Sequence, residues 1–313
     1  MGKFLKRFLI FSLPVLVCGA TLEFKLSGIE NSYRYKVQLL KQAAPEIETL
    51  VFGTSHAYYD FNPKEFKSPG FNLANTSQST VVDAQLFEKH LEALPKLKTV
   101  VLNISYFSFE YRLYGELDDY REYFSIREFG IPGDGGWFSH LDLRRVSWLA
   151  AYGPTVTRRL ARTGFTENLA SEVNERGWFD SSKSQQYRMP VTAEAGRARA
   201  NYHTSTLKAG YAERNLEAIS RTVKRARERG VQVLLTQAPA SKTYYEHLDP
   251  RALKRFDSYI ETLRTGLGLP YHDFLRDSRF VLEDFHDNDH LNATGASKFS
   301  RIFDEEILQP LIK

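Results

Sequence analysis

The sequence predicts an α/β fold in which a parallel sheet lies between two layers of helices. Short apolar runs alternate along the chain with longer segments in which apolar residues recur every three or four positions. The connections between them are short, which is typical of strand–helix–strand units with parallel strands. At 313 residues the chain is long enough to bury a full core, and its single cysteine excludes an internal disulfide.

The N-terminal segment, residues 1–22, is predicted to be a signal peptide or a short membrane anchor. Three basic residues precede an apolar run: Lys3, Lys6 and Arg7, followed by Phe8 to Ala20, which is apolar apart from Ser12. This pattern is typical of an export signal, and positive charge on the near side leaves the rest of the chain outside the cytoplasm. Cleavage after Ala20 and retention as an anchor are both open. We therefore expect a periplasmic or other extracytoplasmic protein, either released or anchored to the inner membrane by this segment.

Residues 23–313 form the predicted domain, and five short apolar runs in it are predicted to form the sheet. Each run is bounded by a turn residue, a proline or a helical segment. Gly53 follows the first run and Pro239 closes the fourth. The predicted strands are Thr49–Phe52, Phe71–Ala74, Thr99–Ile104, Val231–Thr236 and Tyr271–Asp273.

The helices are predicted from apolar periodicity and from the residues that begin or end helices. Pro95 ends one helix, Gly230 ends another, and Asn292 is expected to cap the last. The predicted helices are the connecting stretch 26–48, residues 83–94, a helix through Leu216 and Ala226, residues 250–267 and residues 293–308.

Residues 106–205 do not follow this alternation, and we interpret them as an insertion or cap over the sheet. The start of this region contains eight aromatic residues: Tyr106, Phe107, Phe109, Tyr111, Tyr114, Tyr120, Tyr123 and Phe124. These rings could stack on sugars beside a site, or they could pack the cap against the sheet. The second interpretation is favoured, because aromatic side chains contribute large apolar areas to cores.

The charge of the chain argues against binding of nucleic acid. The formal net charge is +4, and without the three basic residues of the N-terminal segment it is +1. This is too little for a phosphate-binding surface. The basic clusters at 158–162 and 224–229 are local, and the second lies on a predicted amphipathic helix, where a solvated face is the simpler interpretation.

Three polar segments should meet at the carboxyl edge of the sheet, where ligands bind in open parallel sheets. Gly53 directly follows the first predicted strand and lets the backbone turn, so that Ser55 can expose its hydroxyl. Asp287 and His290 lie just before the last predicted helix, three residues apart. The loop 72–79 offers backbone N–H groups that could stabilise an oxyanion.

These residue types are those of a serine nucleophile with its base. A serine hydroxyl needs a neutral imidazole to take its proton, and the imidazole needs a carboxylate to fix its tautomer. The spacing of Asp287 and His290 lets one turn of chain bring the carboxylate to the ring, whereas the adjacent Asp289 is expected to point away. A metal site is the less favoured alternative, because a loop this tight rarely directs four ligands at one ion: His286, Asp287, Asp289 and His290.

Together these residues resemble the SGNH (GDSL-like) hydrolase superfamily, whose three-layer fold is flavodoxin-like. Gly53-Thr54-Ser55 stands where that family has Gly-Asp-Ser, which implies that Ser55 is the nucleophile. Asp287 and His290 match its Asp-x-x-His block. Ser77, five residues after Asn72, stands where the family has an oxyanion-hole glycine, which implies a backbone donor there. The resemblance covers residues 45–110 and 205–310.

The sequence departs from the family pattern in two places. Thr54 replaces the aspartate of the first block, and 104–108 replaces the Gly-x-Asn-Asp block after the central strand. The side-chain donor of that block is therefore missing or supplied by Asn75 or Asn103. This pattern resembles exported members that modify envelope polysaccharides, similar to alginate acetylation proteins and the D-alanylation protein of lipoteichoic acid.

The resemblance implies a serine-dependent acyl esterase or O-acyltransferase that acts on a cell-envelope or exported polysaccharide, with acetyl as the expected acyl group. It implies a carbohydrate or acylated glycan as the substrate, a membrane-bound acyl exporter as a partner, and no cofactor. A non-catalytic polysaccharide-binding or scaffold protein with the same fold is the alternative, and the missing third block is its best support.

Overall fold

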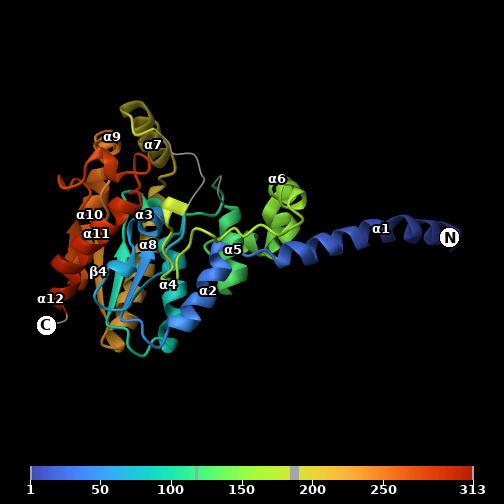
Figure 1. The fold of residues 1–313 in the computed structure, drawn as a ribbon, viewed down its shortest axis with the longest axis horizontal. Helices are drawn as coiled ribbons and strands as arrows, with labels where there is room; N and C mark the ends of the chain where they lie inside the picture. The colour runs from blue at the N-terminus through green and yellow to red at the C-terminus, as the bar shows by residue number, and fades with distance from the viewer. Residues whose placement is uncertain (1, 117–118, 184–189, 312–313) are drawn as a thin grey trace.

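The computed structural model describes residues 2–116, 119–183 and 190–311, and it confirms the predicted three-layer architecture (Figure 1). Five parallel strands form one sheet in the order β2-β1-β3-β4-β5, with helices on both faces. The strands are β1 (Thr49–Gly53), β2 (Gly70–Asn72), β3 (Thr99–Asn103), β4 (Gln232–Gln237) and β5 (Tyr271–Asp273). Because the order reverses at β1, its carboxyl end and that of β3 form the switch point of the sheet.

The crossover helices α4, α8 and α10 lie side by side on one face of the sheet, and α3 and α11 pack together on the other. The helices are α1 (Gly2–Ser27), α2 (Ser32–Ala43), α3 (Ser55–Asp60), α4 (Thr80–His90), α5 (Tyr120–Phe129), α6 (Trp148–Arg162), α7 (Ala193–Ser205), α8 (Ala212–Glu228), α9 (Lys242–Tyr245), α10 (Pro250–Leu267), α11 (Ala293–Phe303) and α12 (Gln309–Leu311). A π-helical segment, Asp304–Leu308, joins the last two.

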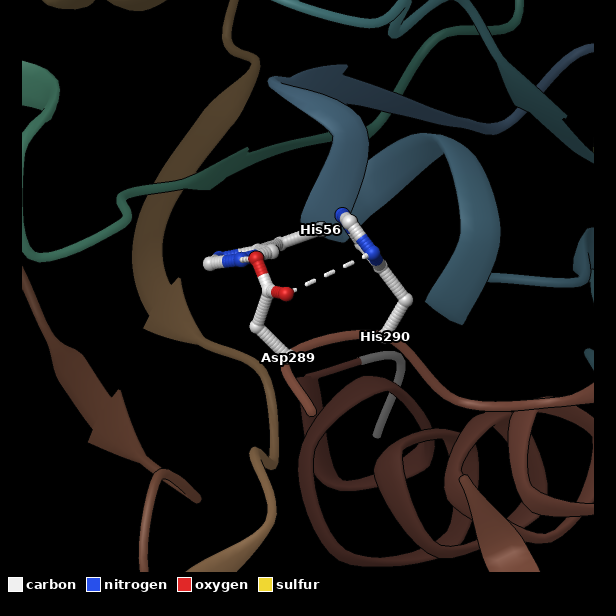
Figure 2. Close-up of side chains that lie close together, drawn as sticks. All are labelled: His56, Asp289 and His290. Carbon is white, nitrogen blue, oxygen red and sulfur yellow. Dashed lines mark hydrogen bonds and ion pairs between the residues drawn. The ribbon is translucent and has the colours of Figure 1, made fainter. Parts of the chain in front are cut away.

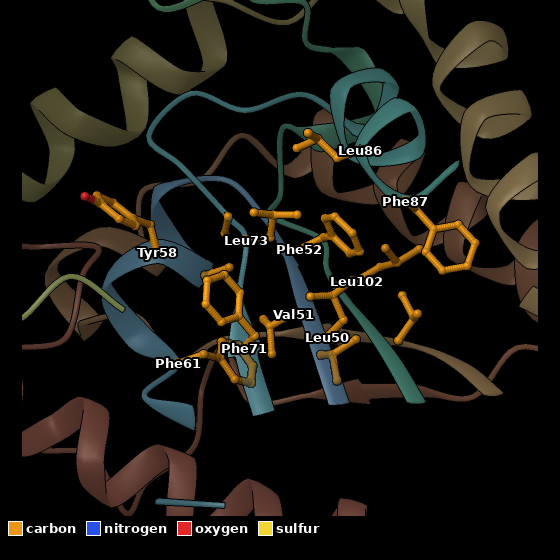
Figure 3. Close-up of a cluster of buried hydrophobic side chains, with 14 of the residues drawn as sticks. Leu50, Val51, Phe52, Tyr58, Phe61, Phe71, Leu73, Leu86, Phe87 and Leu102 are labelled. Carbon is orange, nitrogen blue, oxygen red and sulfur yellow. The ribbon is translucent and has the colours of Figure 1, made fainter. Parts of the chain in front are cut away.

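The core fills the space on both sides of the central strands (Figure 3). Every residue of β1 and β3 is buried, as expected for strands covered on both faces. Phe52 of β1 meets Phe87 of α4 edge to face, with ring centroids 6.4 Å apart. On the other face, Phe61 packs against Phe299 of α11 with centroids 4.8 Å apart.

Two helix boundaries differ from the sequence prediction because polar caps decide where helices begin. Helix α4 begins at Thr80 and not at residue 83, since the hydroxyl of Ser79 accepts a hydrogen bond from Val82 N and caps the helix. The stretch 26–48 is not one helix. Helix α1 ends at Ser27, and Asn31 caps a separate helix α2 by accepting from Arg34 N.

Helix α1 projects from the body of the protein (Figure 1). Residues 6–27 are long and apolar enough to cross a membrane, with a mean hydropathy of 1.7. The base of α1 is nevertheless part of the folded domain: Leu26 is fully buried, and the carboxylate of Glu23 accepts hydrogen bonds from Ser147 Oγ and Leu149 N, both at 3.0 Å.

Gly53, the last residue of β1, permits the sharp turn that leads to Ser55. Its φ of 139° lies in a region that residues with a side chain rarely adopt. A Cβ atom at this position would lie 2.7 Å from the carbonyl oxygen of Asn103 on the neighbouring strand. The turn at the end of β1 therefore depends on the absence of a side chain.

We expect Gly53→Ala to lower the free energy of unfolding by about 1 to 3 kcal/mol, because the methyl group must displace the backbone of β3. Chemical denaturation monitored by circular dichroism measures this change. Gly266→Ala is the matched control, since Gly266 lies in α10 with nothing within 4 Å of the added methyl group, and it should not destabilise. Equal stability of Gly53→Ala and the native chain would contradict the steric argument.

Candidate active site

Asp287 and His290 are in direct contact, as their spacing predicted. Nδ1 of His290 lies 2.9 Å from Oδ2 of Asp287 and 3.0 Å from Oδ1. Oδ1 also accepts the backbone N–H groups of Asp289 and His290, at 3.0 and 2.9 Å. The carboxylate of Asp287 therefore fixes both the conformation of the loop 287–290 and the orientation of the His290 imidazole. Because an ionised carboxylate only accepts, Nδ1 of His290 carries a proton, and Nε2 is left as the atom that can accept one from a substrate or nucleophile.

The helix that begins at Ser55 is fastened to the same loop. The ring of Tyr59 stacks on the imidazole of His290, with centroids 4.6 Å apart and planes inclined by 29°. Oδ1 of Asp60 accepts the backbone N–H of Leu291 at 2.8 Å. Ser55 is one turn before Tyr59, so the two side chains share a face of α3. These contacts bring Ser55 to the side of the loop on which His290 lies.

Ser55, Ser77, Asp287 and His290 line one cavity of about 490 Å³. Nε2 of His290 is buried and has no hydrogen-bond partner among the described residues, Ser55 included. The structure therefore brings the predicted serine and histidine into the same cavity wall without forming the hydrogen bond between them. Such bonds are often long in unliganded enzymes and tighten around the substrate.

Asp289 is the main residue that the sequence interpretation placed wrongly. It was expected to point away, yet its side chain is 1% exposed and faces the cavity wall. Nε of Arg199 lies 3.0 and 2.9 Å from its two carboxylate oxygens. Nε2 of His56 lies 3.1 Å from Oδ2, and Nδ1 of His290 lies 3.8 Å from Oδ1. Figure 2 shows this carboxylate between the two imidazole rings.

His56 belongs to a chain of hydrogen bonds whose direction follows from simple chemistry. Since the carboxylate of Asp289 only accepts, Nε2 of His56 donates to it, and Nδ1 must accept. Nδ1 lies 2.9 Å from Oγ of Ser105, so the serine donates. The Ser105 oxygen lies 2.9 Å from the hydroxyl of Thr54, which then donates in turn. Ser105 is thus bonded to Thr54 and His56, the residues on either side of Ser55, and His56 connects this chain of bonds to Asp289, the residue before His290.

The charges around this carboxylate set the protonation of both imidazoles. Burial opposes the charge on Asp289, but Arg199, His290 and His56 outweigh it and hold the pKa of Asp289 well below its usual range. Burial lowers the pKa of His56, which keeps that ring neutral. Burial also disfavours a charged His290, yet the carboxylates of Asp287 and Asp289 prevail and raise its pKa to about 9.

The two predicted oxyanion residues have different positions. Ser77 lines the cavity, and its φ of 61° is the left-handed conformation that favours glycine. A position of this kind is where the resemblance placed a family glycine. Asn75 is buried but is not among the residues that line the cavity, and its Nδ2 has no partner among the described residues. Asn103 is likewise outside the cavity wall, and its Oδ1 accepts from Ala238 N at 3.0 Å.

The loop that carries Ser77 is held by two buried side chains that the sequence did not single out for this role. Nδ2 of Asn72 donates to the carbonyls of Ala57 and Phe61, at 2.7 and 2.8 Å, which joins the end of β2 to α3. The amine of Lys36 donates to the carbonyl of Ala74. Burial lowers the pKa of Lys36 well below its usual range, so this lysine acts as a hydrogen-bond donor within the core.

The arrangement of donors does not favour a metal ion. Among the described residues, the histidine and carboxylate atoms close enough to share one ion belong to His56, Asp289 and His290, and not to the four residues considered from the sequence. Both oxygens of Asp289 already face Arg199, and Nδ1 of His290 faces Asp287. A cation would have to displace the guanidinium and would meet its positive charge at close range.

Most of the predicted aromatic cluster packs the interior. Six of its eight rings are buried: Tyr106, Phe107, Phe109, Tyr111, Tyr123 and Phe124. Phe107 and Tyr111 also line the cavity, together with Tyr202 of α7. Packing therefore accounts for most of the cluster, and two of its members remain available as walls of the cavity.

The fold and the site define a three-layer α/β protein with a serine and a histidine–carboxylate pair at the switch point of its sheet. No protein-family model and no curated protein matches the sequence. Solved structures with a similar course of the chain include a protein from Bacteroides fragilis described provisionally as an acylhydrolase (TM-score 0.43, 12% identity, 89% of this chain and 96% of that chain covered). Another is a GDSL-like lipase from Bacteroides thetaiotaomicron (TM-score 0.41, 12% identity, 90% and 97% covered). Similarity at this level does not assign an activity.

We expect Asp287→Asn to lower the pKa of His290 from about 9 by roughly 1 to 3 pH units, because the substitution removes a charge hydrogen-bonded to the ring. The titration is followed by NMR of the imidazole, with the signal assigned by its loss in His290→Gln. Asp277→Asn is the control, since Asp277 pairs with Arg279 away from the cavity. An unchanged pKa in Asp287→Asn would show that the contact does not govern the ring.

Proposed function

We propose that this protein is a serine-dependent acyl esterase or O-acyltransferase of the SGNH type, acting on acetyl groups of an exported or cell-envelope polysaccharide. One observation carries the proposal. His290 is held on Asp287 through Nδ1, its Nε2 is unpaired among the described residues, and Ser55 lines the same cavity. A hydroxyl, an imidazole and a carboxylate in this relation are the parts of a nucleophilic triad.

The mechanism follows from these positions. Nε2 of neutral His290 takes the proton of the Ser55 hydroxyl as its oxygen attacks the ester carbonyl. Asp287 keeps the proton on Nδ1 and stabilises the imidazolium that forms. Backbone N–H groups near Ser55 and Ser77 stabilise the oxyanion. His290 then returns the proton to the leaving alcohol, and the acyl group on Ser55 passes to water or to a sugar hydroxyl.

The cavity has walls suited to a carbohydrate ester. Beside the polar triad it is lined by three aromatic and two basic side chains: Tyr59, Phe107, Tyr111, Arg121 and Arg199. Aromatic faces with nearby hydrogen-bond donors bind sugar rings through stacking and directed polar contacts. Residues of α7 form part of the same wall, and a wall that excludes water from the acyl enzyme would favour transfer over hydrolysis.

The N-terminal helix supports an extracytoplasmic location for this chemistry. We propose that α1 is retained as an anchor, because the apolar span and the last turns, where Glu23 and Leu26 pack into the domain, form one continuous helix that cleavage after Ala20 would cut. A membrane-bound acyl exporter would then be a natural donor partner for the transferase form of the reaction.

Ser55→Ala should reduce turnover on the order of 10⁴-fold or more, because the nucleophile is removed while the fold is kept. The assay incubates the purified protein with acetylated and with bare envelope polysaccharide and follows acetate release or uptake by mass. Ser220→Ala, on α8 outside the cavity, is the control.

Fluorophosphonate labelling of the native chain that disappears in Ser55→Ala supports the enzyme. A pure, folded native chain that is neither labelled nor active would instead favour the non-catalytic glycan-binding alternative, which the unformed Ser55–His290 hydrogen bond also fits.

The rate should rise with pH and level off above about pH 9. Only neutral His290 can accept the serine proton, and the pKa of about 9 leaves the ring protonated below that pH. In that range kcat/KM should fall about tenfold for each pH unit of decrease. The measurement is a pH–rate profile of the native chain on an acetyl ester, corrected for alkaline hydrolysis of the ester without protein. The expected midpoint is the His290 pKa of about 9, so a profile from roughly pH 6 to pH 10 covers about three units below it and one above. A rate that does not change over this range would contradict the role of His290 as base.

A further inference from the structure

Four strongly exposed apolar side chains lie within ten residues of one another. Trp137, Leu141, Leu143 and Val146 are 71–73% exposed. Among the described residues outside α1, the next most exposed large apolar side chains, Val281 and Leu282, are 52% exposed. Single exposed apolar residues are common on soluble proteins, but a cluster of them marks a binding surface. We refer to these four residues as the 137–146 patch.

The patch is held in place by the helices around it. The carboxylate of Asp142, between Leu141 and Leu143, accepts from the hydroxyl of Tyr123 on α5 at 2.9 Å. The guanidinium of Arg144 bridges Asp142 and Asp119. The exposed side chains therefore do not belong to a loose loop. Their exposure is fixed by ion pairs and hydrogen bonds to α5.

The patch adjoins the base of α1. Val146 is followed at once by Ser147, which begins the segment that Glu23 of α1 binds through Ser147 Oγ and the N–H groups of Trp148 and Leu149. Figure 1 shows α6, which starts there, standing across α1 at the point where α1 leaves the domain. Glu23 is near the C-terminal end of the apolar span, residues 6–27. If α1 crosses a membrane, the patch lies at the surface from which the domain emerges.

Exposed basic side chains lie on α6, the helix that directly follows the patch. Arg158 and Arg162 of α6 are exposed, and neither has an acidic partner among the described residues. Tryptophan, leucine and unpaired arginine side chains together suit the interface of an anionic leaflet, where rings and aliphatic groups enter the headgroup layer and cations meet lipid phosphates.

We propose that the 137–146 patch, with Arg158 and Arg162, is a second membrane contact that rests in the leaflet beside α1. Two contacts fix the orientation of the domain, whereas a single helix leaves it free to swing. The active-site cavity is then held close to the membrane, because Arg121 in its wall and Tyr123 beneath the patch are on the same short helix, α5. The inference rests on the proposed retention of α1.

The test uses the full chain in lipid nanodiscs that contain anionic lipid, with either plain or brominated acyl chains, because bromine quenches tryptophan on contact. Trp137 is exposed, and the other two tryptophans, Trp148 and Trp178, are buried. The difference between the native chain and Trp137→Phe isolates the emission of Trp137. We expect brominated lipid to remove most of this emission.

Substitutions at Arg158 and Arg162 test the membrane contact without changing the four apolar residues of the patch. Arg158→Glu with Arg162→Glu should weaken the quenching of Trp137, since both side chains are exposed and outside the core. Arg251→Glu, an exposed arginine of α10, is the matched control and should leave the quenching unchanged. A Ser55→Ala chain should be quenched as the native chain is, so the result does not depend on whether the protein is an acyl enzyme.

Three results would overturn the inference. Equal Trp137 emission in plain and brominated lipid would show that the patch does not touch the bilayer. If that emission instead shifts only as the protein concentration rises or when another envelope protein is added, the occupant is a second copy or a protein partner. If the chain recovered from membranes lacks residues 1–20, the anchor on which the inference rests is absent, and the inference is overturned.

Discussion

The architecture of the site depends on the ionised carboxylate of Asp289 and on the groups that contact it. This carboxylate is almost completely buried, and it remains ionised because Arg199, His56 and His290 surround it. A buried charge without partners would cost several kcal/mol, so each of these partners is needed for the others to stay in place. The interaction joins α7, the start of α3 and the loop before α11. The serine and the histidine of the proposed triad are the direct neighbours, in sequence, of residues in this interaction.

The segment 104–108, which stands where the resemblance would place an asparagine donor, has a different role in this structure. Ser105, in the replacement segment, connects Thr54 and His56 through two hydrogen bonds of 2.9 Å. These bonds hold the residues on both sides of Ser55 in place. In the proposed reaction the oxyanion would be stabilised by backbone groups, and Ser77 lies in the cavity wall.

Periodicity and turn residues were enough to predict the sheet, because buried parallel strands and amphipathic helices leave regular patterns of apolar residues. Helix α10 and strand β5 have the predicted limits, 250–267 and 271–273. The contact between Asp287 and His290 was also predictable, since both residues belong to one turn. Asp289 was not, because its partners His56 and Arg199 are distant in sequence and Arg199 lies in a region without apolar periodicity. Local spacing carries no information about which of two nearby carboxylates faces an arginine from another element.

The two halves of the site come from opposite ends of the chain, and this has a consequence for biogenesis. If the domain is exported as proposed, the residues that follow α1 emerge in chain order, so Ser55 emerges early and the segment with Asp287 and His290 almost last. Until that final segment docks on α3, the serine has neither a base nor a closed cavity. Under the proposed function, the domain would therefore cross the membrane in an unreactive form and become reactive only after the last helix is in place.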